Sequence, residues 1–348
     1  GVDSMLVAAV AAHIGVDAET FTFQYTDYDG ELNESAPARA LADHIGLPHH
    51  IIPFAPSDLA DNLDNMVSSF GEPFDYGVHT YMVGQVKTAG MDAVLTGVGA
   101  DGWYLSPTSR YGLLAAGIPS GLRRLGEAAL PGVKLVSKSV AGQIAGILQE
   151  ARVGMPIVSY PRETNGPMLA SLFREGVYDH AGEFLRPPQM AADFAALSDE
   201  SRHDRLTFAG INYYSADTIL CWNNAWSHAY DLPIRHPYFD ADLYDFLMRL
   251  PRREKGKLQF RELAARYMPR HMAYAPKVYQ AAPLSNWFRG PLRDLLHDRL
   301  SPGRINSNGL FDADRVAFVL KRHDSGHEDH AWLLMMLLTI TVWQDLQG

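Results

Sequence analysis

Hydrophobic positions in the first hundred residues alternate between two spacings, one typical of helices and one of short strands. Apolar residues recur at helical spacing from Leu6 to Ile14, and Gly15 ends the run. The next stretch, 20–25, alternates threonine with aromatic residues, which indicates a strand. Further helices are predicted over 33–44, from 56 onward with Ser57 as the N-cap, and over 79–88, and further strands over 50–54 and 91–96.

The order of these segments predicts the fold class. Strands separated by helices favour right-handed crossovers and a parallel sheet covered on both faces. From about residue 105 the strand pattern fades, and the paired prolines 187–188 mark a break, since a helix cannot run through them. We therefore predict an α/β fold, a doubly wound parallel sheet over 1–111, followed by a mainly helical part over 112–348. Helices are predicted in that part over 206–226, 241–250, 260–268 and 331–343.

Composition limits the classes of protein to which the chain can belong. With 348 residues, 47% of them hydrophobic, the chain can bury large cores. A net charge of −10 argues against a nucleic-acid partner, because phosphate backbones require concentrated lysine and arginine. The longest apolar stretch is shorter than the ~20 residues that span a bilayer, so no membrane partner is expected. The single cysteine, Cys221, which we expect to be buried, fits a reducing cytoplasm.

Two short loops place an aspartate beside glycines where a strand should lead into a helix. They are residues 1–4 (Gly-Val-Asp-Ser) and residues 96–101 (Thr-Gly-Val-Gly-Ala-Asp). Carboxylates at one edge of a parallel sheet can hold Mg²⁺ against nucleotide phosphates, so Asp3 and Asp101 predict an enzyme that uses ATP. The simpler alternatives are a helix cap at Asp3 and Ser4 and a turn residue at Asp101. No strand precedes the first loop, so we expect further residues upstream.

The order of motifs resembles the synthetase domain of glutamine-dependent asparagine synthetases and their relatives, which include β-lactam synthetases and lasso-peptide cyclases. Residues 1–4 match the second half of that family's Ser-Gly-Gly-x-Asp-Ser pyrophosphate loop. The other matching positions, in chain order, are Glu72-Pro73-Phe74, residues 96–101, Arg235-His236-Pro237-Tyr238-Phe239-Asp240, Lys257 with Arg261, and Lys277 with Pro283 and Trp287. The resemblance implies a sheet of the pyrophosphate-loop type.

The resemblance also implies site residues. Asp3 and Asp101 would bridge Mg²⁺, while Lys257 and Lys277 would neutralise the leaving pyrophosphate. The residues expected to bind ATP are Gly1, Val2, Asp3, Ser4, Thr22, Gly97, Gly99 and Asp101, with backbone groups near Thr22 meeting adenine. The implied reaction is adenylation of a small-molecule or peptide carboxylate by ATP, followed by attack of an amine or ammonia. A glutaminase-like domain upstream and a homodimer are further expectations from the family.

Several positions depart from the family pattern. Asparagine synthetases carry a glutamate at the position of Val98 that handles protons of the incoming ammonia, and β-lactam synthetases place a tyrosine there. Where the family has an aspartate in its central helix, this chain has Asn224, and Pro233 replaces an acidic residue. Tyr279-Gln280 replaces the Gly-Phe pair that follows Lys277 in the family. These losses favour a specialised amide synthetase, such as a macrolactam cyclase. An authentic asparagine synthetase and a non-catalytic nucleotide-binding scaffold stay open as alternatives.

Three groups of side chains are expected to have structural and not catalytic roles. Adjacent strand positions point to opposite faces, so His49 and His50 are not expected to share a metal ion. The aromatic residues Tyr213, Tyr214, Trp222 and Trp226 lie at spacings typical of packed helices. Arg235 is expected to pair with Asp240 and hold the loop between helices.

Overall fold

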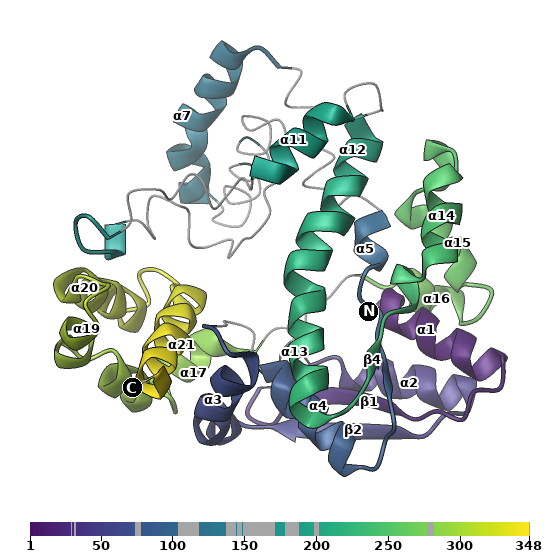
Figure 1. The fold of residues 1–348 in the computed structure, drawn as a ribbon, viewed down its shortest axis with the longest axis horizontal. Coiled ribbons are helices and arrows are strands. Elements are labelled where there is room, and N and C mark those ends of the chain that lie inside the picture. Colours follow the sequence, from purple (N-terminus) through teal and green to yellow (C-terminus); the bar gives the residue numbers. More distant parts are fainter. Residues whose placement is uncertain are drawn as a thin grey trace.

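The computed structural model describes residues 1–28, 30, 33–73, 78–103, 118–136, 144, 148, 171–177, 188–197, 202–276 and 282–347. They form a helix-rich α/β fold with two small sheets (Figure 1). Strands β1 (Thr20–Tyr25) and β2 (His49–Phe54) are parallel, with Thr20 opposite His49. Strands β3 (Val94–Leu95) and β4 (Ile234–Arg235) form a second parallel pair.

The helices of the first hundred residues lie close to their predicted positions. They are α1 (Val2–His13), α2 (Ser35–Ile45), α3 (Pro56–Phe70), α4 (Val78–Thr88) and the short α5 (Ala100–Trp103). Gly46 ends α2 with φ of 74°, a left-handed conformation that glycine adopts without a side-chain penalty. The prediction of alternating helices and parallel strands is confirmed.

The doubly wound sheet is not confirmed, because the described strands form two separate pairs. The strand predicted over 91–96 is only two residues long, and it is not buried, since Leu95 is 46% exposed. Its partner β4 lies between Pro233 and Pro237, and Pro237 begins the 3₁₀ helix η2 (Pro237–Phe239). Proline has no N–H to continue a ladder, so the second pair stays short.

The start of α3 differs from the prediction in its cap. The N-cap is Ala55 and not Ser57, which lies inside the first turn. The Asp58 carboxylate reaches back and accepts the Ala55 N–H at 2.7 Å, while Pro56 occupies the first helical position, where no N–H is needed. An acidic residue three positions after the cap therefore replaces the hydroxyl cap that we expected.

The later part of the chain is helical, as predicted. Figure 1 shows α12, η1 and α13 as one long rod through the middle of the molecule. Its π-helical part η1 is unusually long for that geometry. The elements are α7 (Ser120–Val136), α11 (Pro188–Ala196), α12 (Arg202–Ala209), η1 (Gly210–Leu220), α13 (Cys221–Tyr230), α14 (Ala241–Arg249), η3 (Arg252–Glu254), α15 (Lys257–Ala264), α16 (Arg270–Ala273), α17 (Leu284–Arg289), α18 (Arg293–Arg299), α19 (Pro302–Asn308), α20 (Ala313–Asp324) and α21 (Ala331–Gln347). The break predicted at Pro187 lies outside the described residues, and α11 begins at the next residue.

The described residues form two hydrophobic cores, and the larger one joins the β1–β2 sheet to α3, α13, α17 and α21. Phe54, Trp287 and Leu334 are completely buried in it. It therefore combines residues from both sides of the predicted boundary at 111/112, which itself stays a prediction. No helix among the described residues has both the length and the hydrophobicity needed to cross a bilayer.

Most of the aromatic residues of the long helix formed by α12, η1 and α13 are packed in the interior, as predicted. Tyr213 and Trp226 are buried, and Trp222 packs against the core, whereas the side chain of Tyr214 is not among those described. Cys221 is exposed, so the expectation that it is buried is wrong. At about 100° per residue, position 221 lies on the side of α13 opposite Trp226, and the helix therefore turns the thiol toward solvent.

The smaller core carries the two glycine loops. Its buried residues come from α1, α2, α5, η1, η2, α15 and α16 and include Leu6, Leu41, Trp103, Tyr238 and Phe260. Each glycine loop leads into one of these helices, α1 or α5. The residues predicted to bind the nucleotide therefore rest on a packed layer, which limits how far they can move apart.

A buried histidine near the C-terminus makes the fold sensitive to acid. The imidazole of His323 on α20 is fully buried, and its Nδ1 accepts the His330 backbone N–H at 3.1 Å. Burial, followed by the nearby Arg289 guanidinium, lowers the pKa of His323 to about 4, and Asp329 and Asp324 oppose this only partly. Below pH 6.5 the unfolded chain binds a proton that the folded protein does not, so stability decreases as the pH falls toward 4.

Between pH 6.5 and pH 5 we expect the protonation of His323 alone to lower the free energy of unfolding by about 1–2 kcal/mol. Urea unfolding at the two pH values measures the loss, and His323→Gln should abolish most of it. His327→Gln, at an exposed position, is the matched control and should retain the wild-type dependence. The same pH dependence in His323→Gln as in the wild type would show that another group is responsible.

Candidate functional site

The two glycine loops meet in the structure. Gly97 lies so close to the start of α1 that a Cβ atom there would be 2.3 Å from the Ser4 amide nitrogen and 2.7 Å from the Asp3 carbonyl carbon. No side chain fits at that separation. The backbone of the second loop therefore lies directly against the N-terminus of α1, where free N–H groups and the helix dipole favour anions.

A lysine joins the two predicted carboxylates. Lys257, the first residue of α15, donates from Nζ to Asp3 Oδ1 at 2.6 Å and to Asp101 Oδ1 at 3.1 Å. The Asp3 and Lys257 side chains are 19% and 25% exposed, whereas that of Asp101 is 52% exposed. The structure thus brings together three of the predicted site residues, and their charges are accessible to a ligand.

The segment after β4 supports both loops. Tyr238 donates its hydroxyl to the Asp3 carbonyl at 3.0 Å, and Trp103 donates its indole N–H to the Tyr238 carbonyl at 3.1 Å. Gly99 has φ of 102°, and a Cβ atom there would be 2.5 Å from the Phe239 ring. The motif at residues 235–240 therefore acts as a scaffold beneath residues 96–101 and the start of α1.

The prediction that Arg235 pairs with Asp240 within this motif is wrong. Asp240 is the N-cap of α14 and accepts the N–H groups of Asp242 and Leu243, each at 3.1 Å, with no ion pair to Arg235 among the described contacts. A carboxylate before a helix satisfies free N–H groups there, which fixes where α14 begins.

The carboxyl ends of β3 and β4 place Thr96 beside His236. The Thr96 hydroxyl and His236 Nδ1 are 2.8 Å apart, and the Val98 N–H donates to that hydroxyl at 3.3 Å. Burial lowers the pKa of the His236 imidazole, and no charged side chain contributes to the shift. Sequence reasoning named His236 only as part of the motif at residues 235–240 and gave it no role, because a two-residue strand leaves no periodic signal. Only the pairing of β4 with β3 reveals its position.

Other predicted residues lie apart or outside the described part of the chain. Thr22 is in β1 opposite Ile51, and no described contact joins it to the carboxylates. Lys277 and the positions Phe74, Tyr279 and Gln280 lie outside the described residues. The chain that leads toward Lys277 is held by Arg261, which donates to the carbonyls of Tyr274 at 3.0 Å and Ala275 at 3.1 Å.

The donor set at the loops fits a hard divalent cation. Mg²⁺ is usually bound by one or two carboxylates together with substrate phosphates and water. Asp3 and Asp101 supply two carboxylate oxygens, each within 3.1 Å of one cationic nitrogen. Among the described residues no group of three histidine, cysteine, aspartate or glutamate side chains could hold a metal alone. His49 and His50 contact different partners, Thr20 and Glu19, as expected for opposite faces.

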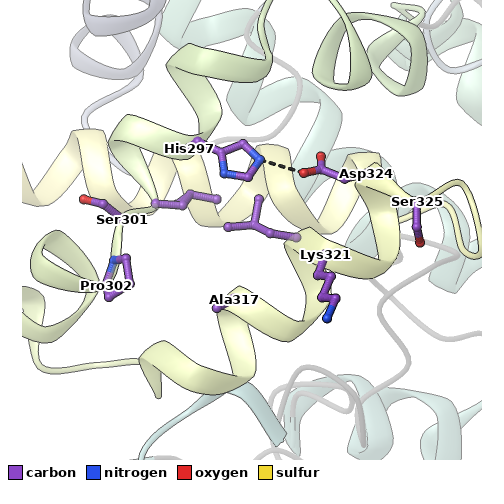
Figure 2. A pocket seen from close by; sticks show the side chains of 9 residues that line it. His297, Ser301, Pro302, Ala317, Lys321, Asp324 and Ser325 are labelled. Carbon is purple, nitrogen blue, oxygen red and sulfur yellow. Dashed lines mark hydrogen bonds and ion pairs between the residues drawn. The ribbon is translucent and has the colours of Figure 1, made fainter.

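A separate cavity of about 510 Å³ lies among the C-terminal helices (Figure 2). His297 and Asp324 pair beside it at 2.9 Å, and Leu300, Ala317 and Leu320 are apolar members of its lining. Its lining comes from residues 297–325 and includes none of the glycine-loop residues. We place the candidate chemistry at the loops, because there the carboxylates and the lysine converge beside a helix N-terminus.

We expect Gly97→Ala to weaken ATP binding at the loops by ~10²-fold or more, because a shift of about 1 Å in a positioned group can cost that much. The added methyl would overlap backbone atoms of Asp3 and Ser4, which cannot rotate away. Gly303→Ala on α19 is the control, since a Cβ there meets nothing within 4 Å. Stabilisation by ATP in a thermal-shift assay measures binding, and an unaffected Gly97→Ala would mean that the loops separate freely.

These features define a class of protein: the chain belongs to the asparagine synthase family, whose sequence model matches residues 1–345. The resemblance inferred from the motifs is therefore confirmed. The chain is also similar to asparagine synthetase [glutamine-hydrolyzing] 1 of Bacillus subtilis (strain 168), with 20% identity over 371 residues. That alignment covers 99% of this chain and 55% of the relative, so the chain spans about half the length of this curated protein.

Proposed function

We propose that the chain is the synthetase part of an ATP-dependent, AMP-forming C–N ligase. The observation that carries the proposal is the convergence of Asp3, Asp101 and Lys257 where two glycine loops meet. An enzyme that joins a carboxylate to an amine must first convert the carboxylate into an electrophile, and adenylation supplies a good leaving group. The arrangement offers an anion-binding helix end, two metal-binding oxygens and a cation in one place.

Each group has a proposed part in the first half-reaction. The N–H groups at the start of α1 would hold the pyrophosphate end of ATP, with Gly97 leaving room for close approach. Mg²⁺ bound by Asp3 and Asp101 would neutralise phosphate charge. Lys257 would then transfer its hydrogen bonds from the carboxylates to the phosphate oxygens as pyrophosphate leaves. Fixed cations at that position act mainly on the transition state, because charge accumulates there.

The residues at the positions that face the attacking amine in the family favour a specialised substrate. Val98 cannot take up a proton, and it occupies the position where relatives carry a residue that handles protons of the nucleophile. Asn224 is exposed on α13, and Pro233 directly precedes β4. We therefore propose an amine larger than ammonia and a carboxylate other than free aspartate, as in a macrolactam or β-lactam-forming enzyme.

An ATP–pyrophosphate exchange assay on the full-length protein tests the proposal. Labelled pyrophosphate, Mg²⁺ and a panel of carboxylates, including L-aspartate, β-amino acids and short peptides, should give exchange that depends on one class of carboxylate. Asp3→Asn should lose the exchange, and Asp17→Asn at an exposed position should retain it. No exchange with any member, while ATP still binds, would favour the nucleotide-binding scaffold.

The second candidate is an authentic glutamine-dependent asparagine synthetase. The observation in its favour is the alignment with the Bacillus subtilis relative over nearly the whole of this chain. L-aspartate is the deciding substrate. Exchange with L-aspartate alone, followed by asparagine formation from ammonia or glutamine, would establish this candidate and remove the specialised one.

A further inference from the structure

We propose that His236 is the general base that takes the proton from the attacking amine, in the role that Val98 cannot fill. The inference rests on the proposed function and adds a residue to its second half-reaction. Two independent observations point to His236: its place at the carboxyl ends of two parallel strands, and an imidazole nitrogen that is buried without a partner in the described part of the chain.

The first observation is position. The pairs Val94–Ile234 and Leu95–Arg235 are followed by Thr96 and His236, which lie side by side where β3 and β4 end. In α/β folds ligands bind beyond the carboxyl ends of parallel strands. Only one residue separates Thr96 from Val98, and Gly97 between them touches the backbone of Asp3 and Ser4. His236 is therefore a neighbour of both the proposed phosphate site and the position of the missing acid–base group.

The second observation is chemical. His236 Nε2 is buried and has no hydrogen-bond partner among the residues that the structure describes. An unpaired buried polar atom is costly and therefore needs an explanation, and a catalytic role is one such explanation. Nδ1 contacts the Thr96 hydroxyl, whose other contact is the Val98 N–H. With Nδ1–H donating to that hydroxyl, Nε2 keeps its lone pair and is ready to accept a proton.

The surroundings keep the imidazole neutral. Burial lowers the pKa of His236, and no charged group opposes or adds to this shift. The Phe239 ring is nearly perpendicular to the imidazole, with ring centroids 6.2 Å apart and an interplanar angle of 82°. An apolar neighbour of this kind disfavours the imidazolium between turnovers. Near neutral pH the residue is therefore in the protonation state that a base needs.

The step balances as a simple acyl transfer. The amine nitrogen forms a bond to the acyl carbon of the acyl-adenylate, and a proton of that nitrogen passes to the lone pair of His236 Nε2. The carbon–oxygen bond to AMP breaks, and its electrons leave with the phosphate oxygen. When the products leave and water enters the site, the imidazolium loses this proton and regains the neutral form, so no further reactant is needed.

His236→Asn separates the proposed base from a purely structural role. The asparagine amide ends near the position of Nδ1 and can still meet the Thr96 hydroxyl, but it places no atom at Nε2. Pyrophosphate exchange, which reports adenylation alone, should stay within about twofold of the wild type, while amide formation should fall by ~10²-fold or more. His297→Asn, which alters a hydrogen-bonded histidine far from the loops, should change neither rate.

The acceptor amine supplies a readout that a structural defect would not produce. Hydroxylamine needs little help from a base, because its conjugate acid is far more acidic than an alkylammonium ion. With the carboxylate that gives the strongest exchange, the defect of His236→Asn should be large with ammonia or an alkylamine and small with hydroxylamine. Nitrogen-15 NMR of histidine-labelled wild-type protein should show His236 protonated at Nδ1 and not at Nε2.

The outcomes distinguish this inference from the proposed function. No exchange in the wild type with any carboxylate overturns the proposed function and the base together. Normal exchange with equal amide formation in the wild type and in His236→Asn overturns the base alone. A proton on Nε2 at neutral pH, or an equal loss with hydroxylamine and ammonia, also overturns it, since His236 would then only support the loop.

Discussion

Replacing Lys257 with methionine should slow pyrophosphate exchange by ~10²–10³-fold, which is the usual cost of losing one positioned charge-stabilising group. The same change should strengthen Mg²⁺ binding to the nucleotide-free protein. Without a ligand, the Lys257 ammonium lies against both Asp3 and Asp101, at 2.6 and 3.1 Å, and so occupies the space that a cation would take. Removing it leaves two neighbouring carboxylates that repel each other and attract a metal more strongly.

The size of the expected change in Mg²⁺ affinity follows from the local charges. Unit charges about 4 Å apart near a protein surface interact by roughly 1–4 kcal/mol, and the exposure of Asp101 favours the lower end. We therefore expect Mg²⁺ affinity to rise about tenfold, which corresponds to about 1.4 kcal/mol. Calorimetric titration of the nucleotide-free protein with Mg²⁺ measures this directly. Lys321→Met, at an exposed position on α20, is the control for a general change in net charge.

A loss of both activity and Mg²⁺ affinity in Lys257→Met would argue for a different role. In that case the lysine would hold the carboxylates in place for the metal, and its contacts would not compete with metal binding. Opposite changes in the two quantities are the result that the geometry predicts.

The largest effect on stability is expected at Trp287, where truncation to alanine should cost about 3–5 kcal/mol of unfolding free energy. The indole is completely buried on α17. It packs edge-on against Tyr25, with ring centroids 5.7 Å apart, and lies 5.8 Å from the ring of Phe54. Its Nε1 donates to both carboxylate oxygens of Asp27, at 3.0 and 2.9 Å. The side chain therefore ties the C-terminal helices to the end of β1.

Two further variants separate packing from hydrogen bonding. Trp287→Phe keeps most of the buried area and loses the indole N–H, so its cost should be about 1 kcal/mol, because Asp27 is exposed and regains water. Trp343→Phe is the matched control, since that indole donates to the Gly71 carbonyl at an exposed position. Urea unfolding measures all three variants. A cost below about 1 kcal/mol for Trp287→Ala would show that the larger core does not depend on this residue.

Local patterns predicted the first hundred residues well, because their elements depend on near neighbours. The strand over 20–25 matches β1 residue for residue, and Gly46 ends α2 as its place after the periodic run indicates. Ser57 misled us because serine is a common N-cap, whereas here the cap is Ala55 and its N–H is satisfied by Asp58 from inside the first turn. Cys221 misled us because flanking apolar residues do not determine which side of a helix faces the core.

The parts of the site that were missed depend on contacts distant in sequence. The meeting of Asp3 with Asp101 was expected because both loops were predicted at one sheet edge, but the Lys257 bridge spans 254 positions and leaves no local trace. His236 lies 140 positions from Thr96 and follows a strand of only two residues. The role of Lys277 stays a prediction, since that residue lies outside the described part of the chain.

The short helix α15 has a consequence for how the site would respond to change. Lys257 and Arg261 are four residues apart, which places them on one side of the helix. Lys257 contacts the carboxylates, and Arg261 donates hydrogen bonds to the Tyr274 and Ala275 carbonyls on the chain that leads toward Lys277. A rotation of α15 would therefore disturb both ends of the proposed phosphate site together. The energetic effects of substitutions at 257 and 261 should accordingly be non-additive, and α15 would act as a coupling element and not only as a support.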